Sequence, residues 1–182
     1  MNRGFTLIEV TILTSVTAVA LVALVNLFLM FNSMYSYQRV FIATAGSSGA
    51  ALNALQASIL PADGVLVSHN FSGTTYTSAT TTLVLELPTV NSSGNLVSGA
   101  KDYVAFYASS TELYRRVEAN AQSVRISGLT LLSTTLSSLS FTYGNVDVTQ
   151  ATNIITDIQT QTQFKQQTIQ SHLREQLYLR NL

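Results

Sequence analysis

The chain opens with a long apolar stretch from Phe5 to Phe31, in which Glu9 is the only charged side chain. At a rise of about 1.5 Å per residue, a helix of this length spans roughly 40 Å, enough to cross a hydrocarbon layer of about 30 Å. The stretch is too long for the apolar core of a cleaved secretory signal, and no small-residue cleavage site ends it. The pattern therefore predicts a retained membrane helix. The Met1 amine and Arg3 lie on the N-terminal side of the stretch, and Arg39 is the first cation on the other side. This asymmetry favours a cytoplasmic N-terminus.

Beyond this stretch, apolar and small residues recur every three or four positions, which is the spacing of one helix face. They are Met34, Tyr37, Phe41, Ala45, Ser48, Leu52, Leu55 and Ile59. Pro61 ends the pattern, because the residue before a proline disfavours helical backbone angles. We therefore expect one continuous helix. Its membrane half covers residues 5–31, and its amphipathic continuation, residues 32–60, buries one face.

After Gly64 the apolar positions recur with a period of two, which is typical of strands. The expected strands are Val65–His69, Thr81–Leu87, Tyr103–Ser109, Glu112–Glu118, Leu136–Tyr143, Asn153–Gln163 and His172–Leu179. Ser109 and Ser110 form a hairpin loop between two of them, whereas the Gln/Thr-rich stretch Thr156–Gln170 suits an edge strand, a loop or a short helix. A helix with one face to bury complements an antiparallel sheet with one face to cover. The prediction is an α+β fold, with the long N-terminal helix packed on a mainly antiparallel β-rich head over residues 61–182.

The composition excludes several classes of function. Cysteine is absent, which removes disulfides, cysteine-ligated metal sites and thiol catalysis. Nine basic residues balance nine acidic ones, and residues 61–182 hold seven basic against eight acidic side chains. No basic field therefore points to nucleic acid as a partner, and Arg115, Arg116 and Arg125 are expected to be ordinary surface arginines.

No pattern of catalytic or metal-binding residues occurs in the sequence of the head. Its acidic residues do not alternate closely as in a calcium loop, and motifs for nucleophile elbows, zinc proteases and phosphate-binding loops are absent. Asp102, beside Lys101, is expected at a solvated strand end. His69 and His172 are isolated in the sequence and are expected at the surface or at strand ends. We therefore predict no enzymatic activity, no cofactor and no metal site.

The segment from Gly4 to Val10 reads Gly-Phe-Thr-Leu-Ile-Glu-Val. It resembles the prepilin signature that type IV pilins share with the pseudopilins of type II secretion systems. The match comprises a short leader with a basic residue, a glycine followed by phenylalanine, a glutamate five positions after that glycine, and the apolar helix. The resemblance implies a pilin-like fold and a leader of residues 1–4. It also implies that a prepilin peptidase cleaves between Gly4 and Phe5 and that the new Phe5 amine is N-methylated.

Glu9 is expected to be the assembly residue. A carboxylate in the apolar layer costs about 2–3 kcal/mol even on permissive insertion scales, so it needs a partner. The apolar stretch offers no cation, whereas cleavage creates one at the Phe5 amine, one helical turn away. Glu9 then pairs with its own amine or with the amine of a neighbouring subunit. The family resemblance implies the neighbour, and a buried pair of this kind specifies register.

Two features separate this chain from most major type IV pilins. Those subunits commonly carry a proline where this chain has Asn26, and many close a C-terminal loop with a disulfide, which is impossible here. The segments Leu83–Pro88, Tyr103–Tyr107, Glu112–Val117 and Leu177–Leu182 resemble minor pilins and J-type pseudopilins. The resemblance therefore implies a minor pilin or pseudopilin that starts or caps a type IV pilus or a type II secretion pseudopilus.

The same resemblance implies a location and a set of partners. The chain would be a single-pass protein of the inner membrane with an extracytoplasmic head. Its partners would be other pilins or pseudopilins, the prepilin peptidase and an inner-membrane platform protein. Two alternatives stay open: a major pilus subunit, or a membrane-anchored binding module that serves adhesion or DNA uptake.

Overall fold

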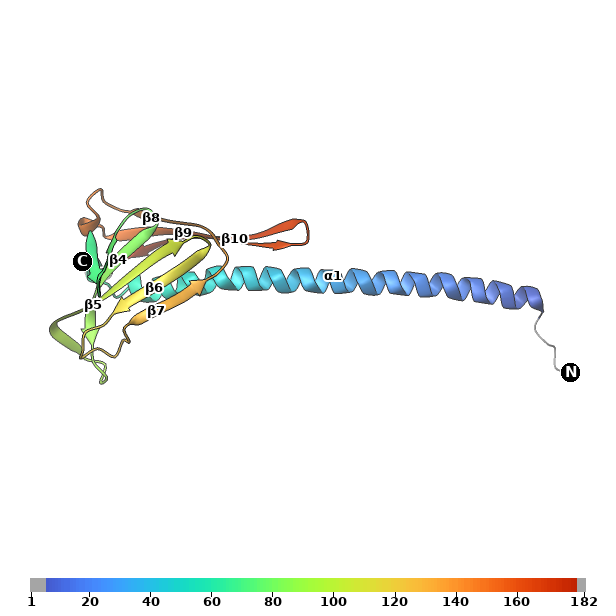
Figure 1. The fold of residues 1–182 in the computed structure, drawn as a ribbon, viewed down its shortest axis with the longest axis horizontal. Helices are drawn as coiled ribbons and strands as arrows, with labels where there is room; N and C mark the ends of the chain where they lie inside the picture. Colours follow the sequence, from blue (N-terminus) through green and yellow to red (C-terminus); the bar gives the residue numbers. More distant parts are fainter. Residues whose placement is uncertain (1–5, 180–182) are drawn as a thin grey trace. The chain divides into compact units, whose positions relative to one another are not determined.

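The computed structural model describes residues 6–179. The chain divides into two compact units, Met1–Val40 and Phe41–Leu182. One long helix, α1 (Leu7–Ile59), begins in the first unit and ends in the second (Figure 1). The predicted helix and its end just before Pro61 are therefore confirmed. The expected start at Phe5 lies outside the described residues.

The first half of α1 has no buried side chain. Every residue from Thr6 to Asn32 is exposed, and the most apolar window of the helix has a mean hydropathy of 2.4. The hydroxyls of Thr11, Ser15 and Thr17 donate to backbone carbonyls four residues earlier, at 2.7–2.8 Å. These bonds satisfy the hydroxyl groups within the helix itself, so they need no partner from outside. An apolar helix of this length is compatible with a single-pass membrane anchor.

The second half of α1 buries a face, but this face begins later than the sequence pattern predicts. Its buried residues are Thr44, Ser48, Ala51, Leu55, Ser58 and Ile59. Met34, Tyr37 and Phe41, which were expected to cover the sheet, are 53%, 39% and 48% exposed. The first buried residue of α1 is Thr44, whose hydroxyl donates to Thr162 Oγ1 of β9.

Ten strands follow α1 in the described part of the chain. They are β1 (Gly64–Val65), β2 (Ser68–Phe71), β3 (Thr74–Thr77), β4 (Thr82–Val90), β5 (Leu96–Ser109), β6 (Glu112–Glu118), β7 (Gly128–Ser133), β8 (Leu136–Tyr143), β9 (Asn153–Phe164) and β10 (Gln167–Tyr178). A short 3-10 helix, η1 (Val148–Gln150), precedes β9. The strands form a five-stranded sheet in the order β1-β4-β5-β6-β7, a three-stranded sheet β10-β9-β8 and the hairpin β2-β3. All pairings are antiparallel, which confirms the predicted α+β fold.

Several strand predictions need correction. The single strand expected at Val65–His69 is divided between β1 and β2, and β3 and β7 were not predicted. The Gln/Thr-rich stretch Thr156–Gln170 is neither an edge strand nor a helix in its first part, because β9 lies between β8 and β10. Thr156 and Thr160 are fully buried there among Ile154 and Ile158. A hydroxyl-bearing β-branched side chain thus occupies core positions that sequence hydropathy marks as polar.

The main core lies between α1 and the two larger sheets. Leu55 and Ile59 pack there with Leu85 and Phe106 of the five-stranded sheet and with Ile158 of β9. Full burial of side chains of this size contributes about 1.5–3 kcal/mol each. A smaller cluster on the opposite face of the five-stranded sheet joins the β2-β3 hairpin to it.

Closer to the middle of α1, hydroxyl groups replace these apolar contacts. Thr44 Oγ1 donates to Thr162 Oγ1 at 3.0 Å. Ser48 Oγ lies 2.8 Å from Ser171 Oγ, and Ser47 Oγ lies 2.8 Å from Ser133 Oγ. The helix is therefore attached to the head by hydroxyl pairs at one end and by apolar packing at the other.

Candidate functional site

The predicted assembly residue, Glu9, lies in the first turn of α1. Glu9 N donates to Thr6 Oγ1 at 3.3 Å, and Glu9 Oε2 accepts from Thr6 N at 2.9 Å. This reciprocal pair is a capping box, which satisfies two backbone N–H groups that a helix start leaves without partners. The carboxylate also favours the positive end of the helix dipole. The predicted processing residues, Gly4 and Phe5, lie outside the described residues.

The capping box uses only one oxygen of the Glu9 carboxylate. Oε2 accepts from both the backbone N–H and the hydroxyl of Thr6, each at 2.9 Å. Within residues 6–179, no donor is recorded on Oε1. An ionised carboxylate has about four acceptor positions on its two oxygens. Glu9 can therefore stabilise its own helix and still accept hydrogen bonds from another group.

Thr6 caps the helix start, and the sequence reasoning did not single it out. The signal was present, because Thr6-Leu-Ile-Glu9 matches the capping-box pattern directly before an apolar run. Without this cap, Glu9 is a lone carboxylate on an apolar helix. With the cap, Glu9 already has a partner in the single chain.

The head contains a second polar cluster, around Asp102, where the prediction of a solvated strand end is wrong. Asp102 is 0% exposed. Its Oδ1 accepts from the Asn120 amide at 2.7 Å and from Thr89 Oγ1 at 3.1 Å. Its Oδ2 accepts from Ser123 Oγ at 2.7 Å and from Arg125 Nη1. The sequence neighbour Lys101 instead points to Asp63 and Glu86.

The partners of Asp102 keep it ionised despite its burial. Burial alone would raise the pKa of the carboxyl, but the bonds from Ser123, the Asn120 amide, Arg125 and Thr89 lower the pKa below its usual value. Arg125 is correspondingly only 25% exposed and also donates to Pro88 O at 2.7 Å. It is thus a structural partner of a buried acid and not the ordinary surface arginine that was expected. The cluster fastens the β6–β7 connection to β4 and β5.

The two histidines lie in different settings. His172 is 57% exposed on β10, with Nε2 at 2.8 Å from Asp157 Oδ1, in agreement with a surface position. His69 stacks on Tyr103 with ring centroids 3.8 Å apart and lies 3.3 Å from Glu118 Oε2. His69 is therefore part of an aromatic cluster, and its side chain is only 23% exposed. Neither histidine belongs to a group of three metal-ligating side chains among the described residues.

These observations leave the N-terminal turn of α1 as the candidate functional site. It combines an exposed apolar surface with a single carboxylate that has acceptor capacity to spare. Comparison of the chain with protein-family models, curated proteins and solved structures gives no match. A function for the chain therefore has to come from the chemistry of its own residues.

Proposed function

We propose that the chain is a minor pilin or pseudopilin, a structural subunit that starts or caps a type IV pilus or a type II secretion pseudopilus. One observation carries the proposal: α1 is exposed and apolar on all sides from its start to Asn32, and its only charge there is Glu9. Such a surface needs lipid around it in the single chain. In a filament, the apolar helices of other subunits take the place of the lipid.

In this proposal the chain is inserted as a prepilin in the inner membrane, with its head on the extracytoplasmic side. The prepilin peptidase cleaves between Gly4 and Phe5, and the new Phe5 amine becomes methylated. A methylated secondary amine still carries a positive charge at neutral pH. The amine of one subunit then meets the Glu9 carboxylate of the next.

The capping box is compatible with the contact between subunits that the family resemblance implies. Thr6 already satisfies Glu9 Oε2 within the same chain. The second oxygen then accepts from the neighbour's amine while the helix start stays capped. Because both charges leave water, a helix that docks out of register would leave each of them buried and unpaired, at a cost of about 3–5 kcal/mol. The pair therefore selects one axial position.

The assignment to a minor subunit is supported by the helix itself. Asn26 stands where major pilins commonly have a proline, and α1 is continuous through this position. A proline would remove one backbone hydrogen bond and clash with the preceding turn. A helix without that proline stays continuous. It therefore suits a small initiating complex better than a fibre that extends when the helices of its subunits melt. Polymerisation itself needs the inner-membrane platform protein and other pilins.

The experiment compares two variants, expressed with the peptidase and the other subunits of the filament. Glu9→Gln keeps an amide oxygen that still caps the helix, but it removes the charge. Thr6→Val removes the capping hydroxyl and keeps the charge. We expect both proteins to insert and to be cleaved, and only the Glu9→Gln protein to be missing from sheared filaments. Normal incorporation of the Glu9→Gln protein would contradict the role proposed for the Glu9 charge. Absence of the unaltered chain from the sheared filaments would favour a membrane-anchored binding module.

A further inference from the structure

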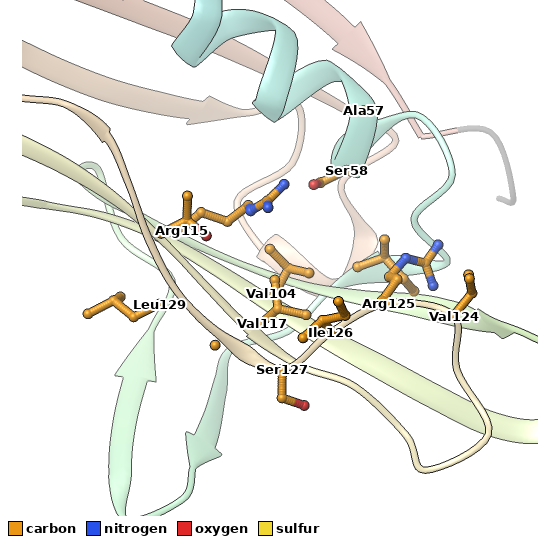
Figure 2. A pocket seen from close by; sticks show the side chains of 13 residues that line it. Ala57, Ser58, Val104, Arg115, Val117, Val124, Arg125, Ile126, Ser127 and Leu129 are labelled. Atoms are coloured by element: carbon orange, nitrogen blue, oxygen red, sulfur yellow. The ribbon is translucent and has the colours of Figure 1, made fainter.

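A pocket lies on the α1 side of the five-stranded sheet, wholly within the second unit. It has a volume of about 590 Å³ and lies between the last turns of α1 at Ala57 and Ser58, strand β6, and the β6–β7 connection. Figure 2 shows the Arg115 side chain extending toward Ser58, with Val104, Val117 and Ile126 along the sheet side. The pocket is separate from the N-terminal turn proposed for assembly.

Arg115 is the unusual residue of this pocket. Its Nε is buried and has no hydrogen-bond partner within the described residues. The neighbouring arginines differ, because Arg116 donates to Phe71 O and Arg125 is paired with Asp102. Leaving a buried donor unsatisfied costs about 1–3 kcal/mol, and more when the group is charged. The Arg115 side chain also lines the pocket, so an acceptor placed in the pocket would meet its guanidinium.

The walls of the pocket specify the acceptor. No Asp or Glu is among the lining residues, and the only other charge, Arg125, is already neutralised. Most of the remaining wall is aliphatic. Val124 and Ile126 at the rim are 58% and 87% exposed, so the apolar surface continues out of the pocket. The complement is an anion that carries apolar groups, and a carboxylate matches the guanidinium with two parallel bonds.

Strand β7 indicates that this anion belongs to a polypeptide. β7 forms the wall at Gly128–Thr130 and ends the five-stranded sheet, and no described strand pairs with its outer edge. Edge strands of this kind accept an added strand through main-chain hydrogen bonds. Leu129 and Leu131 on β7 are also 54% and 44% exposed.

We propose that Arg115 and the β7 edge form a docking site for an extended segment of a partner polypeptide that presents a carboxylate between apolar side chains. The carboxylate binds the Arg115 guanidinium, and the flanking side chains cover Val124 and Ile126. This inference does not depend on the proposed filament function.

The test uses the full chain in lipid nanodiscs, labelled with ¹⁵N-arginine. The probes are the peptide acetyl-Ala-Val-Glu-Val-Ala-amide, its counterpart with glutamine in place of glutamate, and 4-methylpentanoate as a free carboxylate. We expect the glutamate peptide to shift the Arg115 Nε resonance, which is identified by its absence in Arg115→Gln. We also expect the glutamate peptide to bind at least tenfold more tightly than the glutamine peptide.

Arg115→Gln is the test variant, and Arg174→Gln is its matched control. Each variant removes one arginine charge. Arg174 is exposed on β10, away from the pocket. Arg115→Gln should abolish the preference for glutamate, and Arg174→Gln should retain it. Equal binding of the two peptides to the unaltered chain would overturn the proposal without reliance on any variant. Tighter binding of 4-methylpentanoate than of the glutamate peptide would also overturn it, since the site would then serve a small acid.

Discussion

Replacing Asp102 by asparagine keeps the size of a fully buried side chain and removes its charge. In the native head, two donors converge on each carboxylate oxygen, namely Asn120 N and Thr89 Oγ1 on Oδ1, and Ser123 Oγ and Arg125 Nη1 on Oδ2. Asparagine offers one oxygen to the first pair. Its amide nitrogen then faces the guanidinium of Arg125, where two donors meet without an acceptor. The Ser123 hydroxyl can turn and accept instead.

The expected loss of stability follows from this exchange. A hydrogen bond to a charged group contributes about 1.5–3 kcal/mol. Arg125 is 25% exposed and keeps its bond to Pro88 O, so water screens part of the loss. We expect Asp102→Asn to lower the free energy of unfolding of the head by about 2 kcal/mol at neutral pH. The effect should depend on pH. The pKa of Asp102 in the folded head lies below its ordinary value of 3.8, so its contribution is present above that value and is lost as the pH falls below it.

The assay is urea denaturation of the full chain in detergent, followed by the circular dichroism of the strands, at pH 7 and at pH 3. Asp147→Asn serves as the control, because Asp147 caps the exposed η1 and asparagine caps equally well. We expect the control to leave the midpoint unchanged. If Asp102→Asn unfolds at the same urea concentration as the unaltered chain at pH 7, the carboxylate is not holding the β6–β7 connection, and our reasoning on the network is wrong.

Three further predictions concern the whole chain. With the peptidase co-expressed, mass spectrometry should find methylated Phe5 at the mature N-terminus, and retention of Met1 in assembled material would contradict the prepilin assignment. Residues 32–182 should form a soluble monomer that melts cooperatively, because all described residues of the removed segment, 6–31, are exposed; an insoluble product would mean that the boundary is misplaced. Quantitative mass spectrometry of sheared filaments should find this chain scarce, whereas finding it as the most abundant pilin would exclude a minor subunit.

The helix and the principal strands were predictable because local signals define them. Pro61 stops α1, and the alternation in Glu112–Glu118 and Leu136–Tyr143 places β6 and β8 within their observed bounds. The hairpin at Ser110 was also recognisable from its polar loop, and Ser110 has a positive φ of 55° there. β7 was missed because Leu129 and Leu131 are exposed and Leu132 is only partly buried, so apolar residues point to both faces of an edge strand.

The environment of Asp102 was beyond local reasoning. Thr89 precedes it by 13 residues, and Ser123 and Arg125 follow by 21 and 23. Only the pairing of β4 with β5 and the course of the next connection bring these groups together. Sequence proximity instead suggested Lys101, whose side chain lies on the opposite side of the strand. The capping of Glu9 by Thr6, in contrast, has a local signal in the sequence Thr6-Leu-Ile-Glu9. It was missed because attention went to the apolar pattern of the same segment.

The two kinds of contact between α1 and the head have a mechanical consequence. Water can replace a hydroxyl–hydroxyl bond at little net cost, whereas it cannot replace the packing of Leu55 and Ile59. If tension reaches the head through α1, we expect the Thr44 and Ser48 pairs to open before the apolar packing does. The apolar turns beyond Ala51 resist, because separating them exposes the core all at once. The hydroxyl pairs of α1 with the head would thus open and re-form while the apolar packing beyond Ala51 still holds.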